Sequence, residues 1–334
     1  MSGHDELIKD ALALQASRAP SGERVLTRLS VVRQPVSRLV LVGVTALVIA
    51  IAVGIPFALR PSAPEPVTFP AASAASSTLK YGATWLPDGF RERFRASDSD
   101  GWGQVRNWAN GPMTISLGVN STRNPMWTDA AASIESGYDK ADIGGVTASY
   151  SRIDGGAKLT WIPEPGTVLL LTLRGVPDMR TVAVEVAGSV RPDGTSSIST
   201  GLEFGRLPAG LAKTSMQLGG VSPETGAGEI VASGGVTTLT ASLSREPAWV
   251  DGQAVVVRGR QGVYAAPVKD SGGFSDGVLA VELDGGRWLV LRSPQVMSAA
   301  GEQLSTPLSS SDFVAVADSL TVSATPDHSW IGTR

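Results

Sequence analysis

An uninterrupted apolar run from Leu39 to Leu59 is the feature that most constrains how this chain can fold. The run contains no charged side chain, and Arg38 and Arg60 lie at its two ends. At about 1.5 Å per residue, a helix of this length spans the roughly 30 Å hydrocarbon core of a bilayer. A helix buried in a protein core rarely stays free of charge over such a length. The sequence therefore predicts a transmembrane helix over residues 39–59.

A cleaved signal peptide is the alternative interpretation of this run. Signal peptides have an apolar region of only about 7–15 residues near the start of the chain, whereas this run begins after residue 38. The tripeptide Ala72-Ser73-Ala74 nevertheless resembles a cleavage site. We expect an uncleaved anchor, and cleavage stays open as the alternative.

Basic residues predict the orientation of the anchor. Between the run and Lys80, the only basic residue is Arg60. The segment that precedes the run contains six of them, namely Lys9, Arg18, Arg24, Arg28, Arg33 and Arg38. Because positive charge stays on the cytoplasmic side, we expect a single-pass protein of the cell membrane. Its N-terminus would be cytoplasmic, its C-terminal domains extracytoplasmic, and the lipid bilayer its first partner.

Composition excludes several classes of function. The 334 residues carry 28 Lys and Arg against 31 Asp and Glu, so no basic surface for nucleic acid is expected. Cysteine is absent, which excludes disulfides and thiolate chemistry, and the two histidines, His4 and His328, stand near opposite ends. No catalytic set, metal site or cofactor site can be assembled from these residues. The sequence predicts a protein that is not an enzyme and has no cofactor.

The segment before the membrane, residues 1–38, is expected to be a cytoplasmic leader. It carries two apolar stripes at helical spacing, one on each side of Pro20-Ser21-Gly22. The first stripe consists of Leu7, Ile8, Ala11 and Leu12, and the second consists of Val25, Leu26 and Leu29. These side chains could dock the leader on a cytosolic partner such as a sigma factor. A disordered or surface-lying leader is the alternative. Residues 60–80, rich in Pro, Ala and Ser, predict an extended stalk.

Beyond the stalk, short motifs recur in the same order. Trp85-Leu86-Pro87-Asp88-Gly89-Phe90 is similar to Arg206-Leu207-Pro208-Ala209-Gly210-Leu211, and Thr167–Leu171 is similar to Arg287–Leu291. Residues 81–195 and 202–326 are therefore expected to be two copies of one domain. Alternating runs predict strands at Gln104–Ala109, Thr114–Val119, Val146–Ile153, Ala157–Ile162 and Thr167–Arg174. Helical spacing predicts helices at Ala130–Ser136, Asp178–Val190 and Ser310–Ser319.

These elements predict an α+β fold class. We expect one transmembrane helix followed by two tandem repeats, each a mostly antiparallel sheet with a closing helix against one face.

The motifs also resemble a known family. The W-L-P-x-G-F opening at Trp85–Phe90 and the endings Ala187–Val190 and Ala317–Leu320 resemble uncharacterised extracytoplasmic domains of Gram-positive membrane proteins. Some of those domains lie on the outer side of anti-sigma factors. With the leader segments Glu6–Leu12 and Arg18–Leu26, the layout is similar to actinobacterial single-pass proteins encoded near extracytoplasmic-function sigma factors. The resemblance implies an anti-sigma-like regulator, although the zinc-binding type needs cysteines that this chain lacks.

One cluster of residues predicts a ligand surface outside the cell. It comprises Trp102, Arg106, Trp108, Arg123 and Trp127. Exposed aromatic rings of this kind could bind an envelope sugar or peptide, whereas packing in a core is the alternative. We therefore expect a non-catalytic binding or sensing protein. The alternatives are an anti-sigma-like regulator whose leader docks a sigma factor, and a structural or assembly factor of the cell envelope.

Overall fold

The computed structural model of the chain describes residues 76–137, 139–248, 250–270, 273–296, 304–305, 307–323 and 327–333. These residues belong to one compact unit, Ala63–Arg334. The predicted leader, the predicted membrane segment and most of the predicted stalk lie outside them. Within the described ranges, no helix is both long enough and apolar enough to cross a membrane.

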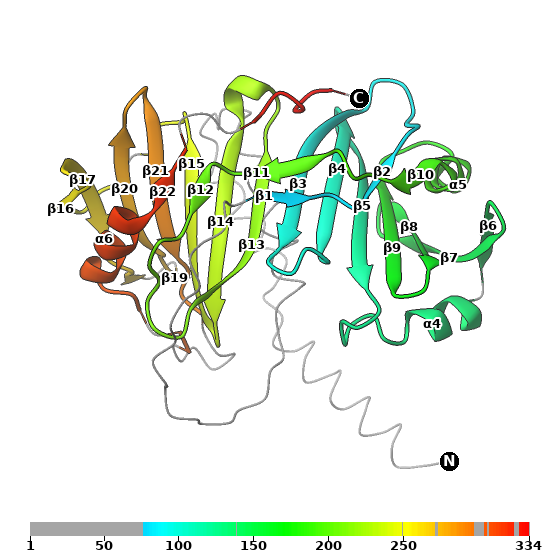
Figure 1. The fold of residues 1–334 in the computed structure, drawn as a ribbon, viewed down its shortest axis with the longest axis horizontal. Helices are drawn as coiled ribbons and strands as arrows, with labels where there is room; N and C mark the ends of the chain where they lie inside the picture. The colour runs from blue at the N-terminus through cyan, green and yellow to red at the C-terminus, as the bar shows by residue number, and fades with distance from the viewer. Residues whose placement is uncertain are drawn as a thin grey trace, which may run out of the picture. The chain divides into compact units, whose positions relative to one another are not determined.

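Fourteen antiparallel strands form one continuous sheet (Figure 1). Its first half runs outward from the centre through β3 (Arg91–Asp98), β4 (Gln104–Asn110), β5 (Met113–Ser121), β9 (Thr167–Arg174), β8 (Gly156–Glu164), β7 (Val146–Ile153) and β6 (Lys140–Ile143). Its second half runs outward through β13 (Ala212–Gly219), β14 (Ala227–Gly234), β15 (Thr237–Ser244), β21 (Arg287–Ser293), β20 (Gly277–Leu283), β17 (Arg260–Ala265) and β16 (Gln253–Val257).

The two halves join through the pairing of β3 with β13. Ser215 lies opposite Asp98, and Gly219 lies opposite Phe94. The strands form because small, β-branched and aliphatic residues alternate along them, so that one side of each strand is buried. Short turns connect neighbours. Between β16 and β17, Arg258 and Gly259 both have positive φ, at 55° and 72°, which is the geometry of a two-residue type I′ hairpin.

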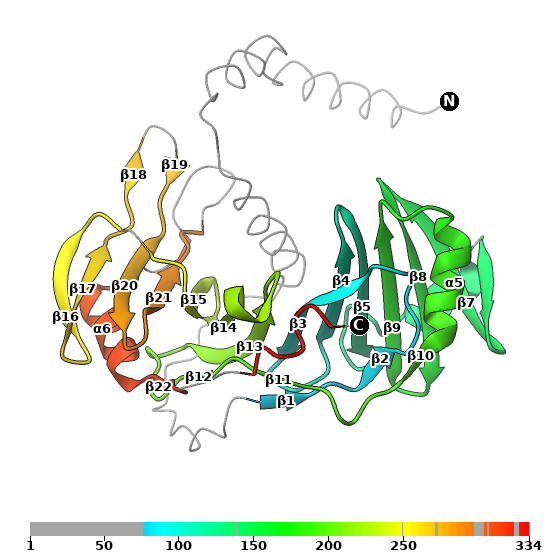
Figure 2. The ribbon, with the colours of Figure 1, turned by 90° about the horizontal axis from the view of Figure 1, so that it is seen from above.

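Three α-helices are present among the described residues. They are α4 (Ala130–Ser136), α5 (Met179–Ser189) and α6 (Ser310–Ser319), and one 3₁₀ turn, η1, covers Pro223–Thr225. A capping box starts α6, because the Ser309 hydroxyl accepts from the Asp312 N–H and the Asp312 carboxylate accepts from the Ser309 N–H. Figure 2 shows α5 beside β8 and β9 in the first half and α6 beside β16 and β20 in the second.

Four short ladders add to the main sheet. They are β1 (Ser76–Thr78) with β11 (Ser197–Ser199), β2 (Tyr81–Ala83) with β10 (Val190–Pro192), β12 (Leu202–Glu203) with β22 (Thr321–Val322), and β18 (Lys269–Asp270) with β19 (Gly273–Phe274). The strand β1 falls within the residues predicted as stalk, and the side chain of Leu79 that follows it is buried. The end of that segment is therefore part of the folded unit.

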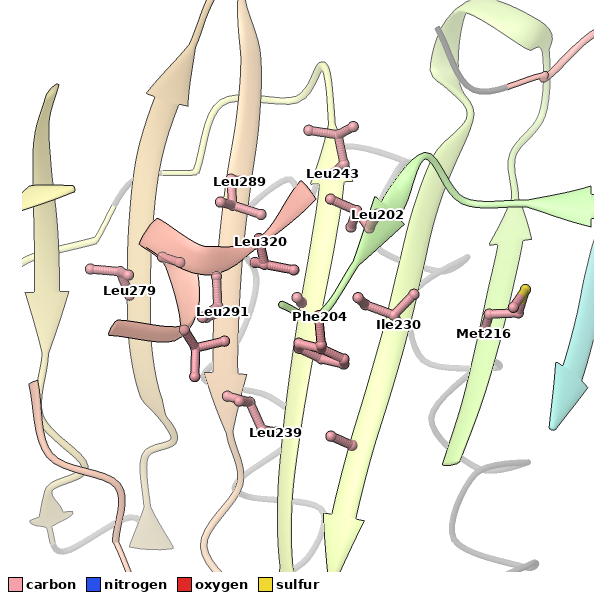
Figure 3. Packing of buried hydrophobic residues seen from close by; sticks show 14 of the residues in the cluster. Leu202, Phe204, Met216, Ile230, Leu239, Leu243, Leu279, Leu289, Leu291 and Leu320 are labelled. Atoms are coloured by element: carbon pink, nitrogen blue, oxygen red, sulfur yellow. The ribbon is translucent and has the colours of Figure 1, made fainter. Parts of the chain in front are cut away.

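Each half of the sheet has its own apolar core. The first-half core packs α5 against β4, β5, β7, β8 and β9 and includes Trp108, Leu171 and Val186. The second-half core packs α6 and β12 against the other strands, and Figure 3 shows Leu239, Leu291 and Leu320 gathered in it. Burial of these side chains, each contributing roughly 1.5–3 kcal/mol, is the main stabilising term.

The prediction of an α+β fold with two tandem repeats is wrong. Strands make up 49% of the structure and helices 13%, and the strands form one large sheet. The strands β3 and β13, at the start of the two expected copies, pair with each other and leave no free edge between them. Joining the edges satisfies main-chain groups that two separate sheets would leave exposed, which single-strand patterns in the sequence do not reveal.

Candidate ligand-binding site

The residues predicted as one aromatic surface occupy different environments. Trp108, in β4, is only 1% exposed and belongs to the first-half core. Arg106 is largely buried, with its guanidinium 5.3 Å from the Trp108 ring. Trp102 and Trp127 are half-buried in loops, and Arg123 is exposed. Of the three tryptophans, Trp102 borders a depression in the surface.

This depression has a volume of about 450 Å³. Its walls come from four parts of the chain that are far apart in sequence: the segment around β2, the turn between β3 and β4, the end of β8 with the start of β9, and the end of β10 with the residues that follow it. We call it the Lys80–Trp102 depression. Its lining residues are Thr78, Leu79, Lys80, Tyr81, Trp102, Glu164, Thr167, Pro192, Asp193 and Gly194.

The turn between β3 and β4 positions Trp102. The Asp98 carboxylate accepts the main-chain N–H groups of Trp102 and Gly103, at 2.8 and 2.5 Å, and Asp100 also accepts from Trp102. A side chain at Gly103 would displace the Asp98 carboxylate from this position, so glycine allows the close contact. Burial and the neighbouring Asp100 raise the pKa of Asp98 to about 6. The acidic residues of this turn therefore hold the loop in shape.

Lys80 lies directly on the Trp102 ring. Its Nζ is 3.0 Å from the ring centroid, a cation–π contact. The main-chain N–H of Lys80 donates to the Gln104 side chain at 2.8 Å, and the Gln104 amide donates to the carbonyl of Thr78 at 2.8 Å. Desolvation lowers the pKa of Lys80, although Asp100 and Asp98 partly oppose it. These contacts fix the approach to β2 against β4.

The opposite wall is built around Glu164. The Tyr81 hydroxyl donates to Glu164 Oε1 at 2.6 Å, and the Thr167 hydroxyl donates to the same oxygen at 3.3 Å. Burial, together with the hydrogen bond to Glu164, raises the pKa of Tyr81 to about 12. The tyrosine therefore stays protonated at neutral pH and can only donate to its acidic neighbour.

The third wall is Asp193. Its carboxylate accepts from Arg106 Nη1 at 2.7 Å and from the main-chain N–H groups of Thr195 and Ser196 at 3.1 and 2.9 Å. Burial opposes ionisation, but the hydrogen bonds from Ser196 and Thr195 outweigh it and hold the pKa of Asp193 well below its usual range. Asp193 is therefore a fixed negative charge.

Behind Asp193 lies a buried charge network of Glu92, Arg95, Arg106 and Asp193. Glu92 is 2% exposed, and both arginines bind its carboxylate through two nitrogens each, at 2.8–3.0 Å. A β-bulge between Glu92 and Phe94 turns Glu92 and Arg95 to the same side of β3. Such double contacts are the strong form of a charge-assisted hydrogen bond.

A segment from much later in the sequence completes this network. The Arg95 guanidinium lies 4.1 Å from the Trp330 ring, and Arg95 Nη1 also donates to the carbonyl of Ser197 at 2.7 Å. The N–H of Glu92 donates to the carbonyl of Thr333, and the N–H of Gly332 donates to the carbonyl of Glu92, both at 2.8 Å. Residues 330–333, which form a turn, therefore bind the main chain of β3 at Glu92 through two hydrogen bonds.

Sequence reasoning missed most of this site. The wall residues form no local motif, because Lys80 and Tyr81, Glu164, and Asp193 come from three distant parts of the chain. The one local signal is the charge of β3, a strand that was not predicted from the sequence, in which Glu92 and Arg95 are buried. Among the described residues, no group of three or more His, Cys, Asp or Glu side chains is arranged to hold a metal ion. The arrangement can bind a polar ligand through an aromatic face, an ammonium and two carboxylates.

Comparison with known proteins adds a distant likeness. Similar solved structures include MucB in complex with MucA(peri), at 11% identity and a TM-score of 0.23, covering 71% of this chain and 94% of that one. The MucA/MucB complex of Pseudomonas aeruginosa has 13% identity, a TM-score of 0.23 and the same coverage. MucB alone has 11% identity and a TM-score of 0.18, with 69% and 91% covered. TM-scores this low assign neither a function nor a partner.

No protein-family model matches the chain, and no curated protein matches it either.

Proposed function

We propose that this chain is a non-catalytic protein that binds an envelope sugar or peptide in the Lys80–Trp102 depression. The observation that carries this proposal is that the charged groups around the depression are already fixed by other protein groups. Lys80 lies on Trp102, Glu164 accepts from Tyr81, and Asp193 accepts from Arg106. Groups held in this way recognise a ligand at little cost in conformational entropy.

Their protonation states favour binding over turnover. A general acid or base works best when its pKa is close to the pH at which it acts. The pKa of Tyr81 is raised to about 12, and the pKa of Asp193 is held well below its usual range. Neither group changes charge near neutral pH. Asp98, with a pKa of about 6, is engaged with the N–H groups of its own turn.

The same proposal includes the location of the protein. The apolar run Leu39–Leu59 and the excess of basic residues before it support our proposal that the binding unit lies outside the cell and is attached to the membrane. Protease treatment of intact cells should then remove residues after 80 and leave the leader intact. Protection of the later residues together with digestion of the leader would reverse the orientation.

Tryptophan fluorescence of the full chain in detergent tests the ligand. Glycan strands and stem peptides released from cell wall are titrated separately, and the proposal expects one of them to cause a saturable change. Trp102→Leu and Glu164→Gln should abolish that change, whereas Trp127→Leu, which alters a tryptophan outside the depression, should retain it. Saturable binding that is indifferent to both depression variants would overturn the assignment, as would the absence of binding by either probe.

The leader supports a second candidate function, an anti-sigma-like regulator. Its apolar stripes, with Leu7, Leu12 and Leu26 among them, suit a peptide that folds on a cytosolic partner. Residues 1–38 used as bait should then capture a sigma factor, and replacing these three leucines together by Asp should abolish capture. Capture that survives this change would exclude the stripes as the contact. A stable envelope complex without ligand or sigma factor would instead indicate an assembly factor.

A further inference from the structure

The two outer strands of the sheet, β6 and β16, differ in whether charged side chains and hydrogen bonds protect their free edges. Each pairs with one strand among the described residues and so presents a row of main-chain donors and acceptors on its other side. β6 has the sequence Lys-Ala-Asp-Ile, whereas β16 has the sequence Gln-Ala-Val-Val-Val, without a charge. An apolar edge of this kind is normally protected unless something pairs with it.

The hairpin geometry shows which groups of β16 face outward. In a two-residue hairpin, the residues that flank the turn form a hydrogen-bonded pair, here Val257 with Arg260. Val255 and Gln253 then also bond to β17, since bonded pairs alternate along an antiparallel ladder. The N–H and C=O groups of Ala254 and Val256 therefore point away from β17. No hydrogen bond to these groups occurs among the described residues.

The edge of β6 is blocked by contrast. By the same alternation, Lys140 and Asp142 are its outward-facing residues. The carbonyl of Lys140 already accepts from Arg180 Nη2 at 2.8 Å, and the Asp142 carboxylate accepts from the N–H of Gly145 at 3.1 Å. Charged residues at an edge discourage pairing with another chain. On β16, the outward residue Val256 is 70% exposed instead.

We propose that β16 pairs with β16 of a second copy of this chain, in antiparallel register centred on Val255. This register places Ala254 opposite Val256 of the other copy, and Val256 opposite Ala254. The outward groups of these residues then form four main-chain hydrogen bonds, and the two sheets become one across a twofold axis. Because both partners present the same surface, the interface is isologous and closes at two copies.

Side chains favour a second copy over an unrelated strand. Val255 packs against the second-half core, and the register sets it against Val255 of the other copy on that same face. At the ends of the interface, Asp251 comes beside the Arg258-Gly259-Arg260 turn of the other copy. Arg260 already pairs with Asp284 of its own chain, and the exposed Arg258 guanidinium binds the main-chain carbonyls of Ala317 and Leu320. The positive charge that faces Asp251 at each end is therefore that of Arg258.

Cysteine cross-linking tests the register, because the chain contains no cysteine. In a non-hydrogen-bonded antiparallel pair the Cα atoms are about 4.5 Å apart, which suits a disulfide. Val255→Cys in the full-length protein in detergent should therefore form a covalent dimer under mild oxidation. Val256→Cys is the matched control, since it is more exposed but lies diagonally from its copy in this register. Equal or faster cross-linking of Val256→Cys would show random collision and overturn the register.

Sedimentation measures the dimer itself. The full-length protein in detergent should show a reversible monomer–dimer equilibrium, and Val256→Lys should raise the dimer dissociation constant about tenfold or more, because a charged residue at an edge strand discourages pairing with another chain. Val236→Lys, at an exposed position in the turn after β14, should leave the constant unchanged. A wild-type protein that stays monomeric, or a dimer unaffected by Val256→Lys, would contradict the proposal.

Discussion

Each half of the sheet contains seven strands, but the two halves are stabilised differently where they meet. In β3, at the inner edge of the first half, the side chains of Glu92 and Arg95 are buried. In β13, at the inner edge of the second half, Met216 and Leu218 are buried instead. Among the described residues, the buried charged side chains thus belong to β3, whereas the buried polar side chains of the second half, such as Thr200 and Ser293, are uncharged.

This difference separates two contributions to a fold. Apolar burial stabilises without regard to direction, so the second half can tolerate some repacking. A buried ion pair gives little net stability but becomes very costly when one partner is lost. The charge network therefore sets the position of the segments that meet at β3, namely the strand itself, residues 193–197 and residues 330–333.

The largest expected effect comes from breaking the network. Glu92→Ala leaves Arg95 and Arg106 buried beside an uncharged site, so the free energy of unfolding should fall by about 3–5 kcal/mol. Urea unfolding followed by tryptophan fluorescence measures this loss. Replacing Glu92, Arg95 and Arg106 by Met and Asp193 by Asn together should recover most of the stability, since no charge of the network is then left unpaired. A quadruple variant less stable than Glu92→Ala would mean that the network is stabilising in itself.

Creating a cavity in the apolar second-half core is the change to compare with the loss of Glu92. Leu291→Ala removes a fully buried side chain and should lower the free energy of unfolding by about 3 kcal/mol. Leu291→Met, which conserves the volume, should cost less than about 1.5 kcal/mol. Equal losses in the two variants would indicate that shape, and not burial, limits this core.

A smaller effect depends on pH and belongs to the β3–β4 turn. The pKa of Asp98 is raised to about 6, so between about pH 4 and pH 6 the folded state binds more protons than the unfolded state. Stability from this group is present at low pH and is lost as the pH rises through that window. Relative to Asp98→Asn, the wild type should lose up to about 1 kcal/mol between pH 4 and pH 7, because solvent screens a half-buried group.

The pH dependence of stability that comes from Asp193 should have the opposite sign, so Asp193 serves as a control. Its pKa is lowered, so its contribution is present at neutral pH and is lost as the pH falls below its usual range. Urea unfolding of Asp98→Asn and Asp193→Asn at several pH values should therefore give differences of opposite slope. Parallel slopes would contradict the assignment of the two carboxyl groups.

The smallest expected effect is the loss of the cation–π contact. Lys80→Gln should lower the free energy of unfolding by about 0.5–1 kcal/mol and shift the emission of Trp102, because the ring loses the ammonium above it. Lys158→Gln, on β8 and away from the depression, is the control and should change neither quantity. An emission spectrum unaffected by Lys80→Gln would exclude the stacked geometry.

Local patterns in the sequence were sufficient for many elements. Alternation predicted the strands at Val146–Ile153 and Thr167–Arg174, and helical spacing predicted the helix at Ser310–Ser319, with the bounds that the structure has for β7, β9 and α6. What local patterns do not contain is which strand pairs with which. The joining of β3 to β13 depends on main-chain groups that every strand carries, so two separate sheets were predicted where one exists.

The candidate site was harder to predict than the strands and helices, because it also depends on which distant segments pair with each other. Of the candidate residues, Trp102 borders the depression, whereas Trp108, six residues later in β4, belongs to the core. Lys80 fell in the segment predicted as stalk, and Asp193 and Glu164 had no neighbours in sequence to suggest a shared site. Pairing between distant segments creates the depression, and only a structure reveals such pairing.

The contact of residues 330–333 with β3 also sets an order of events during synthesis. Glu92 and Arg95 leave the ribosome early, but the Trp330 ring and the Thr333 carbonyl that contact them arrive only after the whole second half. Until then the edge of β3 beside Glu92 is open, and contacts between such distant residues form slowly. A chaperone that shields this edge, or export of the chain before it folds, would protect the first half during that interval. Truncation before residue 330 should therefore prolong the time for which newly made chains remain sensitive to protease.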